Sequence, residues 1–180
     1  MESIRTERML NVPNLLTILR IGLLPAIVSR FRLGDMRGTL ALYLLAMLTD
    51  VLDGTVARRL GQITAVGKLL DPLADKLSLL TMLWLFVSDG QISGWVLWFV
   101  LVKELLLVAG SAAVLTRGIV VYALPVGKAA TVVFTASMTM RFFAFESMAD
   151  ILLGIFILLS LASLAWYLAA GAERIRHASA

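Results

Sequence analysis

The stretch TDVLDGTVARRLGQITAVGKLLDPLADKLS, residues 49–78, holds four aspartates that border long apolar runs: Asp50, Asp53, Asp71 and Asp75. A carboxylate near hydrocarbon is costly, so aspartates in such a setting indicate a functional role. Four negative charges held close together also raise one another's pKa values or require a cation. The rest of the chain is best understood as an arrangement around this stretch.

The spacing of the aspartates places them on the faces of two predicted helices. Asp50 and Asp53 are three residues apart on the first helix, and Gly67, Asp71 and Asp75 follow at intervals of four on the second. Two antiparallel helices joined by a short polar loop can point all four carboxylates into one space. Oxygen ligands of this kind suit Mg²⁺, Mn²⁺ or Ca²⁺.

Small residues accompany the first pair of aspartates. Gly54 and Ala57 would let a ligand approach the first helix closely. The alternative interpretation is structural, with the aspartates capping helices or pairing with four nearby cations: Arg58, Arg59, Lys68 and Lys76. A single aspartate would fit that interpretation, but four aspartates on two faces favour a functional site.

The full pattern resembles the signature of a known family. Asp50-x-x-Asp53-Gly54-x-x-Ala57-Arg58, then eight residues, then Gly67-x-x-x-Asp71-x-x-x-Asp75 is similar at every defining position to the CDP-alcohol phosphatidyltransferases. This resemblance implies transfer of a phosphatidyl or similar group from a CDP-linked donor, CDP-diacylglycerol, to an alcohol, with release of CMP. It also implies an all-α integral membrane protein of six transmembrane helices, commonly a homodimer, with the site open to the cytoplasm.

The resemblance further implies a role for each aspartate. Asp50, Asp53 and Asp71 would bind two divalent cations, Mg²⁺ or Mn²⁺. Asp75 would contact the second cation and act as the general base.

Other motif positions are expected to bind substrate. The resemblance implies that Gly54 and Ala57 lie against the cytidine of the donor and that Arg58 holds the nucleotide end. Gly67 is counted with them as a substrate-binding position.

A polar stripe crosses the first apolar run. Asn14, Thr17 and Arg20 follow one another at intervals of three residues. Arg20 could snorkel to the membrane surface, but it lies well inside the run. We therefore expect the stripe to lie near the aspartates, with Asn14 and Thr17 among the substrate contacts.

The acceptor alcohol is less constrained by the sequence. The strings PNLLT (13–17) and LDPLADK (70–76) and the short chain are most similar to phosphatidylglycerophosphate synthases, whose acceptor is glycerol 3-phosphate. Its phosphate needs basic side chains as partners, and Lys128, Lys103 and Arg117 are the candidates.

Phosphatidylglycerophosphate synthases often carry an Arg-Glu pair and a further arginine in the fourth span, whereas this chain has Lys103-Glu104 and no such arginine. A cardiolipin synthase with phosphatidylglycerol as acceptor is therefore an alternative, and a phosphatidylinositol-phosphate synthase is a third.

Lys103 and Glu104 lie in the middle of the predicted fourth span. Adjacent positions do not share a helix face. We therefore expect each side chain to have its partner on another helix.

The composition indicates a membrane protein, because 60% of the 180 residues are hydrophobic and the mean hydropathy is +0.92. A single membrane domain over 1–180 is the simplest organisation, with an interfacial segment at 1–10. Six spans are predicted, at about 14–31, 39–57, 67–87, 93–115, 119–140 and 151–170.

The charges bear on topology and partners. An excess of Arg and Lys on the side of the termini favours a cytoplasmic location for that side and for the aspartates, although Arg30, Arg32 and Arg37 lie on the other side. We expect a bacterial inner membrane. The net charge of +4 favours contact with anionic membrane lipids over contact with nucleic acid. A carboxylate-lined cation transporter is the non-enzyme alternative, but its charges would follow a path and not gather at one interfacial end.

Overall fold

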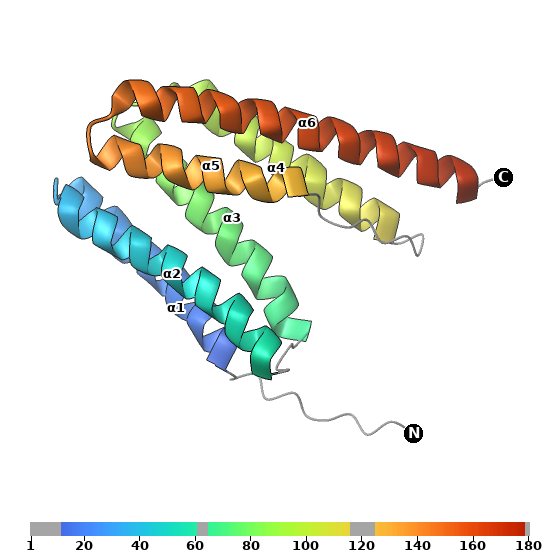
Figure 1. Cartoon of the computed structure of the whole chain (residues 1–180), viewed down its shortest axis with the longest axis horizontal. Coiled ribbons are helices and arrows are strands. Elements are labelled where there is room, and N and C mark those ends of the chain that lie inside the picture. The colour runs from blue at the N-terminus through green and yellow to red at the C-terminus, as the bar shows by residue number, and fades with distance from the viewer. Residues whose placement is uncertain (1–11, 61–64, 116–124, 179–180) are drawn as a thin grey trace. The chain divides into compact units, whose positions relative to one another are not determined.

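The computed structural model describes residues 12–60, 65–115 and 125–178; several side chains near the helix ends, those of residues 53–60 and 65–69 among them, fall outside the description. The described residues form helices and no strand, which confirms the all-α expectation. The helices are α1 (Val12–Arg32), α2 (Met36–Leu60), α3 (Ala65–Ser88), α4 (Gly94–Leu115), α5 (Pro125–Phe142) and α6 (Glu146–Ala178) (Figure 1).

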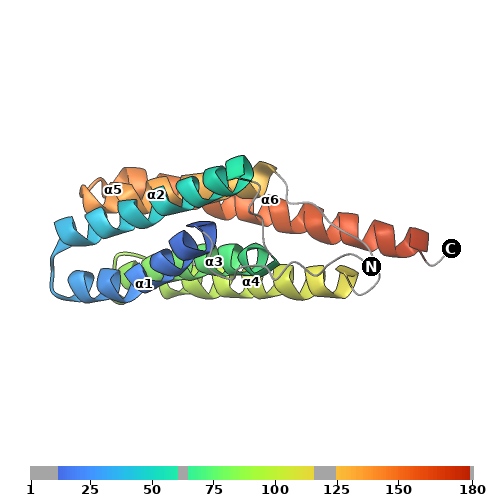
Figure 2. The same ribbon diagram turned by 90° about the horizontal axis from the view of Figure 1, so that it is seen from below.

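Backbone contacts divide the chain into two units of three helices each, Met1–Ile92 and Ser93–Ala180. In the first unit α1 packs against both α2 and α3. Figure 2 shows α1 and α2 joined by a tight turn, with α3 alongside α1. In the second unit α6 packs against α5 and α4. The helix at the centre of each unit is therefore α1 in the first and α6 in the second.

One face of α1 is buried from Asn14 to Phe31. Its buried positions recur every three or four residues, as they do on a helix side that faces its neighbours: Asn14, Thr17, Arg20, Leu24, Ile27 and Phe31. The first half of this stripe is polar and the second half is apolar. The apolar half builds a core, where the Phe31 and Phe86 rings meet edge to face with centroids 5.4 Å apart.

The second unit has its own core between α5 and α6. The Phe134 and Phe156 rings lie with centroids 5.0 Å apart. Close to the α5–α6 turn, the buried Ser137 hydroxyl donates a hydrogen bond to the Ala149 carbonyl, at 2.7 Å. One turn further along α5, the buried Arg141 guanidinium pairs with the Asp150 carboxylate.

The predicted boundaries of α1 to α4 hold to within three residues, but those at the α5–α6 turn are wrong. Residues 141–150 were expected to form the turn, but only residues 143–145 separate the two helices. Ala144 takes a φ of 58°, in the left-handed region, which closes the chain in few residues. The acidic Glu146 suits the positive end of α6 and favours this earlier start.

Pro72 and Pro125 differ in their places along the helices. Because α3 begins at Ala65, Pro72 lies in the helix interior and removes one backbone hydrogen bond. Pro125 is the first described residue of α5, and the predicted start of that span near residue 119 lies outside the described residues.

Two of the described helices are long and apolar enough to cross a membrane. They are the segments Asn14–Arg32 of α1 and Glu146–Ala169 of α6. This finding supports association with a membrane. The expected interfacial segment at residues 1–10 lies outside the described residues.

The α1–α2 turn is closed by a capping carboxylate. Asp35 accepts a hydrogen bond from the Gly38 N–H at 2.8 Å and one from Arg30 Nη1 at 2.9 Å. The Gly38 N–H, helped by Arg30, holds the pKa of the Asp35 carboxyl below its ordinary value. Asp35 thus caps the start of α2 and fixes how α2 folds back on α1.

We predict that Gly38→Ala lowers the thermal stability of the protein. A Cβ at Gly38 would lie 2.8 Å from the Asp35 Cγ, so the capping carboxylate must move away. We expect the melting temperature in detergent to fall by about 2–4 °C, as for the loss of one helix cap.

Gly22→Ala in α1 is the matched control, since a Cβ there would meet nothing within 4 Å. It should leave the melting temperature unchanged or raise it. Equal melting temperatures for the two variants would contradict the capping role of Asp35.

Candidate functional site

Arg20 joins the carboxylates of two other helices. Its side chain is fully buried in the first unit, and Nη1 lies 2.6 Å from Asp50 Oδ1 on α2 and 2.6 Å from Asp75 Oδ1 on α3. Two oxygens that share one nitrogen in this way lie close to each other. The structure therefore confirms that the polar stripe of α1 lies beside the aspartates, and Arg20 does not snorkel to the surface.

A second contact joins α1 to α3 one turn earlier. Thr17 Oγ1 donates a hydrogen bond to Asp71 Oδ1 at 2.6 Å. Thr17 precedes Arg20 by three residues and Asp71 precedes Asp75 by four, so each step is about one helical turn. The two contacts are thus in register along two helices that run in the same direction. Asn14 is buried one turn further along the same face of α1.

The structure describes only part of the predicted site. Three of the four aspartates, Asp50, Asp71 and Asp75, line up against the α1 stripe. Several predicted residues lie on α2 or α3 with side chains outside the description: Asp53, Gly54, Ala57, Arg58 and Gly67. Arg117 falls in residues 116–124, which lie outside the described ranges.

The two sides of the cluster differ in exposure. The Arg20 side chain is 0% exposed, whereas those of Asp50 and Asp75 are 42% and 53% exposed. The guanidinium therefore approaches the carboxylates from the protein interior, and the carboxylates keep an accessible side. The accessible side is where a charged ligand can approach them.

The described side chains fit a divalent cation in donor type and charge. Carboxylate oxygens are the ligands that Mg²⁺ and Mn²⁺ prefer, and two of them already converge on a positive centre, the Arg20 nitrogen. Within the described residues, no group of three acidic, histidine or cysteine side chains closes around one point. If a cation binds here, its further ligands would come from water, from a substrate or from side chains outside the description, such as that of Asp53.

Lys103 and Glu104 contact each other, contrary to the expectation from their adjacent positions. Lys103 Nζ lies 2.6 Å from Glu104 Oε1. It also lies 5.7 Å from the centroid of the Phe156 ring on α6. The long side chains reach around the helix surface although their Cβ atoms point to different sides.

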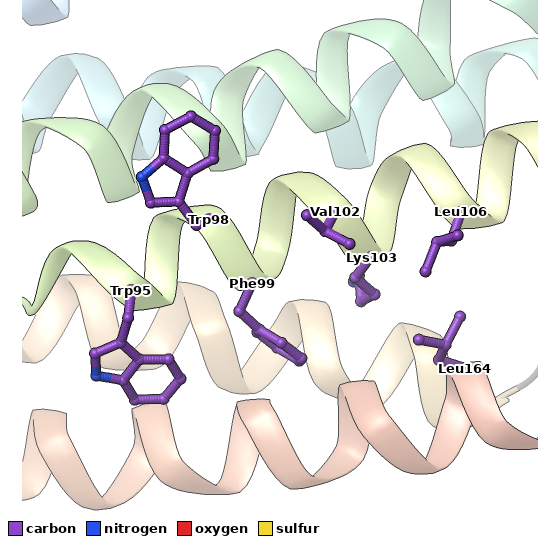
Figure 3. A pocket seen from close by; sticks show the side chains of 7 residues that line it. All are labelled: Trp95, Trp98, Phe99, Val102, Lys103, Leu106 and Leu164. Carbon is purple, nitrogen blue, oxygen red and sulfur yellow. The ribbon is translucent and has the colours of Figure 1, made fainter.

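An apolar groove of about 420 Å³ borders Lys103 in the second unit (Figure 3). Six of its residues come from α4 and one from α6: Trp95, Trp98, Phe99, Val102, Lys103, Leu106 and Leu164. Lys103 is the single charged residue among them, and Glu104 compensates its charge. This lining suits hydrocarbon better than a phosphate. Lys128, by contrast, is exposed in the first turn of α5.

The role of Arg20 is only partly evident from the sequence. Its position predicts a place near the aspartates but no specific partner. The available signal was its interval of three from Thr17, on the stripe that α3 covers. The sequence alone does not show that Asp50 and Asp75 converge on one nitrogen of Arg20.

Comparisons with known proteins identify the family. Residues 10–166 match the family model for CDP-alcohol phosphatidyltransferase. A Mycobacterium bovis protein named "Putative cardiolipin synthase" is 35% identical over 136 residues, covering 73% of this chain and 64% of that protein.

Two further relatives are each named CDP-diacylglycerol–glycerol-3-phosphate 3-phosphatidyltransferase. The Aquifex aeolicus protein is 37% identical over 112 residues, covering 60% of this chain and 62% of that protein. The Rickettsia bellii protein is 46% identical over 71 residues, covering 37% and 39%. The chain thus matches less than two thirds of the length of each of these relatives.

We predict that Thr17→Val destabilises the first unit. Valine keeps the shape of threonine but cannot donate the hydrogen bond to Asp71. Loss of a bond to a charged acceptor should lower the free energy of unfolding by about 1–2 kcal/mol. Denaturant unfolding in detergent, followed by circular dichroism, measures this change.

Thr17→Ser, which keeps the hydroxyl, is the control and should lose less stability than Thr17→Val. If the serine variant were the less stable of the two, the threonine methyl group and not its hydroxyl would be the stabilising part.

Proposed function

The chain belongs to the CDP-alcohol phosphatidyltransferase family, and we propose that it transfers a phosphatidyl group from CDP-diacylglycerol to an alcohol with release of CMP. The observation that carries this proposal is the convergence of Asp50 and Asp75 beside Asp71. A partly exposed set of carboxylates between helices can gather cations, and a diphosphate donor needs cations to neutralise its charge.

Glycerol 3-phosphate is the proposed acceptor, which would make phosphatidylglycerophosphate the product. The names of the Aquifex and Rickettsia relatives support this choice. A cardiolipin synthase, with phosphatidylglycerol as acceptor, is the second candidate. The Mycobacterium relative supports it, and that alignment covers 73% of the chain, more than the other two.

We propose that Asp50, Asp53, Asp71 and Asp75 together hold two divalent cations, Mg²⁺ or Mn²⁺. When bound, such cations neutralise phosphate charge and stabilise the charge that develops on the departing CMP. The described contacts support a positioning role for Thr17, because its hydroxyl already donates to Asp71. Asn14, buried one turn earlier, remains a proposed substrate contact.

Asp75 is the proposed general base. It would take the proton from the acceptor hydroxyl as the new oxygen–phosphorus bond forms and the bond to CMP breaks. Two observations support this role: the carboxylate is 53% exposed and so can meet a substrate, and one of its oxygens is fixed by Arg20 at 2.6 Å.

The remaining substrate contacts are proposed from the motif and from the basic side chains of lysine and arginine. Gly54, Ala57 and Arg58 would receive the cytidine nucleotide, with Gly67 on the facing helix. For the acceptor phosphate, Lys128 is the better candidate, since it is exposed while the Lys103 charge is compensated by Glu104. Arg117 stays a candidate outside the described residues.

The membrane setting extends the same proposal. We propose a single domain over 1–180 with six transmembrane helices, in a bacterial inner membrane, and an active site that faces the cytoplasm. The two helices with the length and hydropathy of membrane spans support this, as does the distribution of Arg and Lys. Partners would be membrane lipids and a second copy of the chain, as a homodimer.

We predict that the purified protein releases CMP from CDP-diacylglycerol when Mg²⁺ or Mn²⁺ and glycerol 3-phosphate are present. Parallel reactions would contain phosphatidylglycerol or inositol phosphate as the only acceptor. Release with phosphatidylglycerol alone would identify a cardiolipin synthase instead. Cation uptake into vesicles without any CMP release would contradict the transferase and favour a transporter.

We predict that Asp75→Asn lowers the rate of transfer by about 10²–10⁴-fold, the usual contribution of a general base. Asparagine keeps an oxygen that can accept from Arg20, so CDP-diacylglycerol binding should persist. The measurement is CMP release alongside a donor binding titration.

Asp35→Asn, which changes an aspartate of the distant α1–α2 turn, is the control and should leave turnover unchanged. Near-normal turnover in Asp75→Asn would exclude Asp75 as the base.

A further inference from the structure

We propose that Arg20 is the internal counter-charge of the aspartate cluster and competes with divalent cations for it. By this inference, which rests on the proposed function for the existence of a cation site, Arg20 stabilises the metal-free protein and weakens its affinity for metal. Arg20 would be a positioning residue, because it acts through Asp50 and Asp75 and not on the substrate.

The first step is the electrostatics of the cluster without metal. Arg20 is fully buried, and a charge taken out of water is costly unless it is paired. Asp50 and Asp75 supply that pairing through contacts of 2.6 Å each. In return, the guanidinium offsets the repulsion between two carboxylates that would otherwise face each other. Removing Arg20 would leave both negative charges together, without this cation.

The second step is the response to a cation. A divalent ion that binds these two carboxylates must come close to the Arg20 nitrogen, since both acidic side chains already contact it. Like charges repel each other, and the repulsion is screened least on the buried side of the carboxylates, where Arg20 lies. Metal binding therefore requires the guanidinium to withdraw or to give up part of its pairing. This cost lowers the affinity for metal, while the same contact allows the three helices to pack before any metal arrives.

A second buried arginine supplies a matched control. Arg141 in the other unit is also nearly inaccessible, with 2% of its side chain exposed, but its described ion pair is with one carboxylate, that of Asp150. If burial of a paired arginine were all that mattered, Arg20→Met and Arg141→Met would behave alike. The inference instead predicts that only Arg20→Met changes the response to metal.

The experiment uses the full chain in lipid nanodiscs and Mn²⁺ as the probe. Thermal unfolding is recorded in EDTA and in Mn²⁺, and the electron paramagnetic resonance signal of unbound Mn²⁺ gives the dissociation constant. We expect Arg20→Met to bind Mn²⁺ at least about tenfold more tightly than wild type, which corresponds to about 1.4 kcal/mol. Its melting temperature should fall in EDTA and recover in Mn²⁺. Arg20→Lys, which keeps the charge, should stay within about threefold of the wild-type dissociation constant.

Arg141→Met should lose the same stability in EDTA and in Mn²⁺ and keep the wild-type dissociation constant. If Arg20→Met folds only when purified with Mn²⁺, that supports the inference in its strongest form. If it folds under neither condition, Arg20→Lys decides, because Mn²⁺ binding more than about threefold weaker than wild type in that variant would overturn the inference. Unchanged or weaker Mn²⁺ binding by a folded Arg20→Met would overturn it as well.

The outcomes also separate this inference from the proposed function. Wild-type protein that binds Mn²⁺ and releases CMP, with Arg20→Met unchanged in affinity, would overturn only the role of Arg20. If the wild-type protein bound no Mn²⁺, so that Asp50→Asn had no Mn²⁺ binding to lose, the cation site and this inference would both be overturned.

Discussion

The ion pairs between Arg20 and two aspartates are the constraint on which the first unit depends. A buried guanidinium needs its carboxylates, and two neighbouring carboxylates need a cation. Because Asp50 comes from α2 and Asp75 from α3, this mutual need fixes both helices against α1. The polar contacts that hold the helices together are thus the same contacts that place the candidate catalytic groups.

Much of this arrangement follows from the sequence, because the relevant signals are local. Intervals of three and four residues place Thr17 with Arg20, and Asp71 with Asp75, on single helix faces. The all-α fold follows from the apolar runs. The partners across helices do not follow, because pairing depends on which faces meet. The motif therefore identifies the aspartates, while only the packing of α1 shows that Arg20 lies between two of them.

The errors have the same physical origin at a smaller scale. Lys103 and Glu104 were predicted to have separate partners, because adjacent Cβ atoms point to different sides of a helix. Their flexible side chains nevertheless bring the charged ends within 2.6 Å of each other. The sequence predicts a polar turn at residues 141–150, but Arg141 and Asp150 lie in helices and pair with each other. In both places charged residues suggested exposure or separate partners, and an ion pair allowed them to stay with the packed helices.

The buried stripe of α1 has a consequence for which sequence changes the family can tolerate. Its polar half ends at Arg20 and its apolar half begins at Leu24, on the same face. One added residue between them would turn the halves apart by about 100°. Either Arg20 would leave its aspartates or Leu24 and Phe31 would leave the core. We therefore expect the number of residues between Arg20 and Leu24 to be the same in all functional relatives, even where the identities of those residues vary freely.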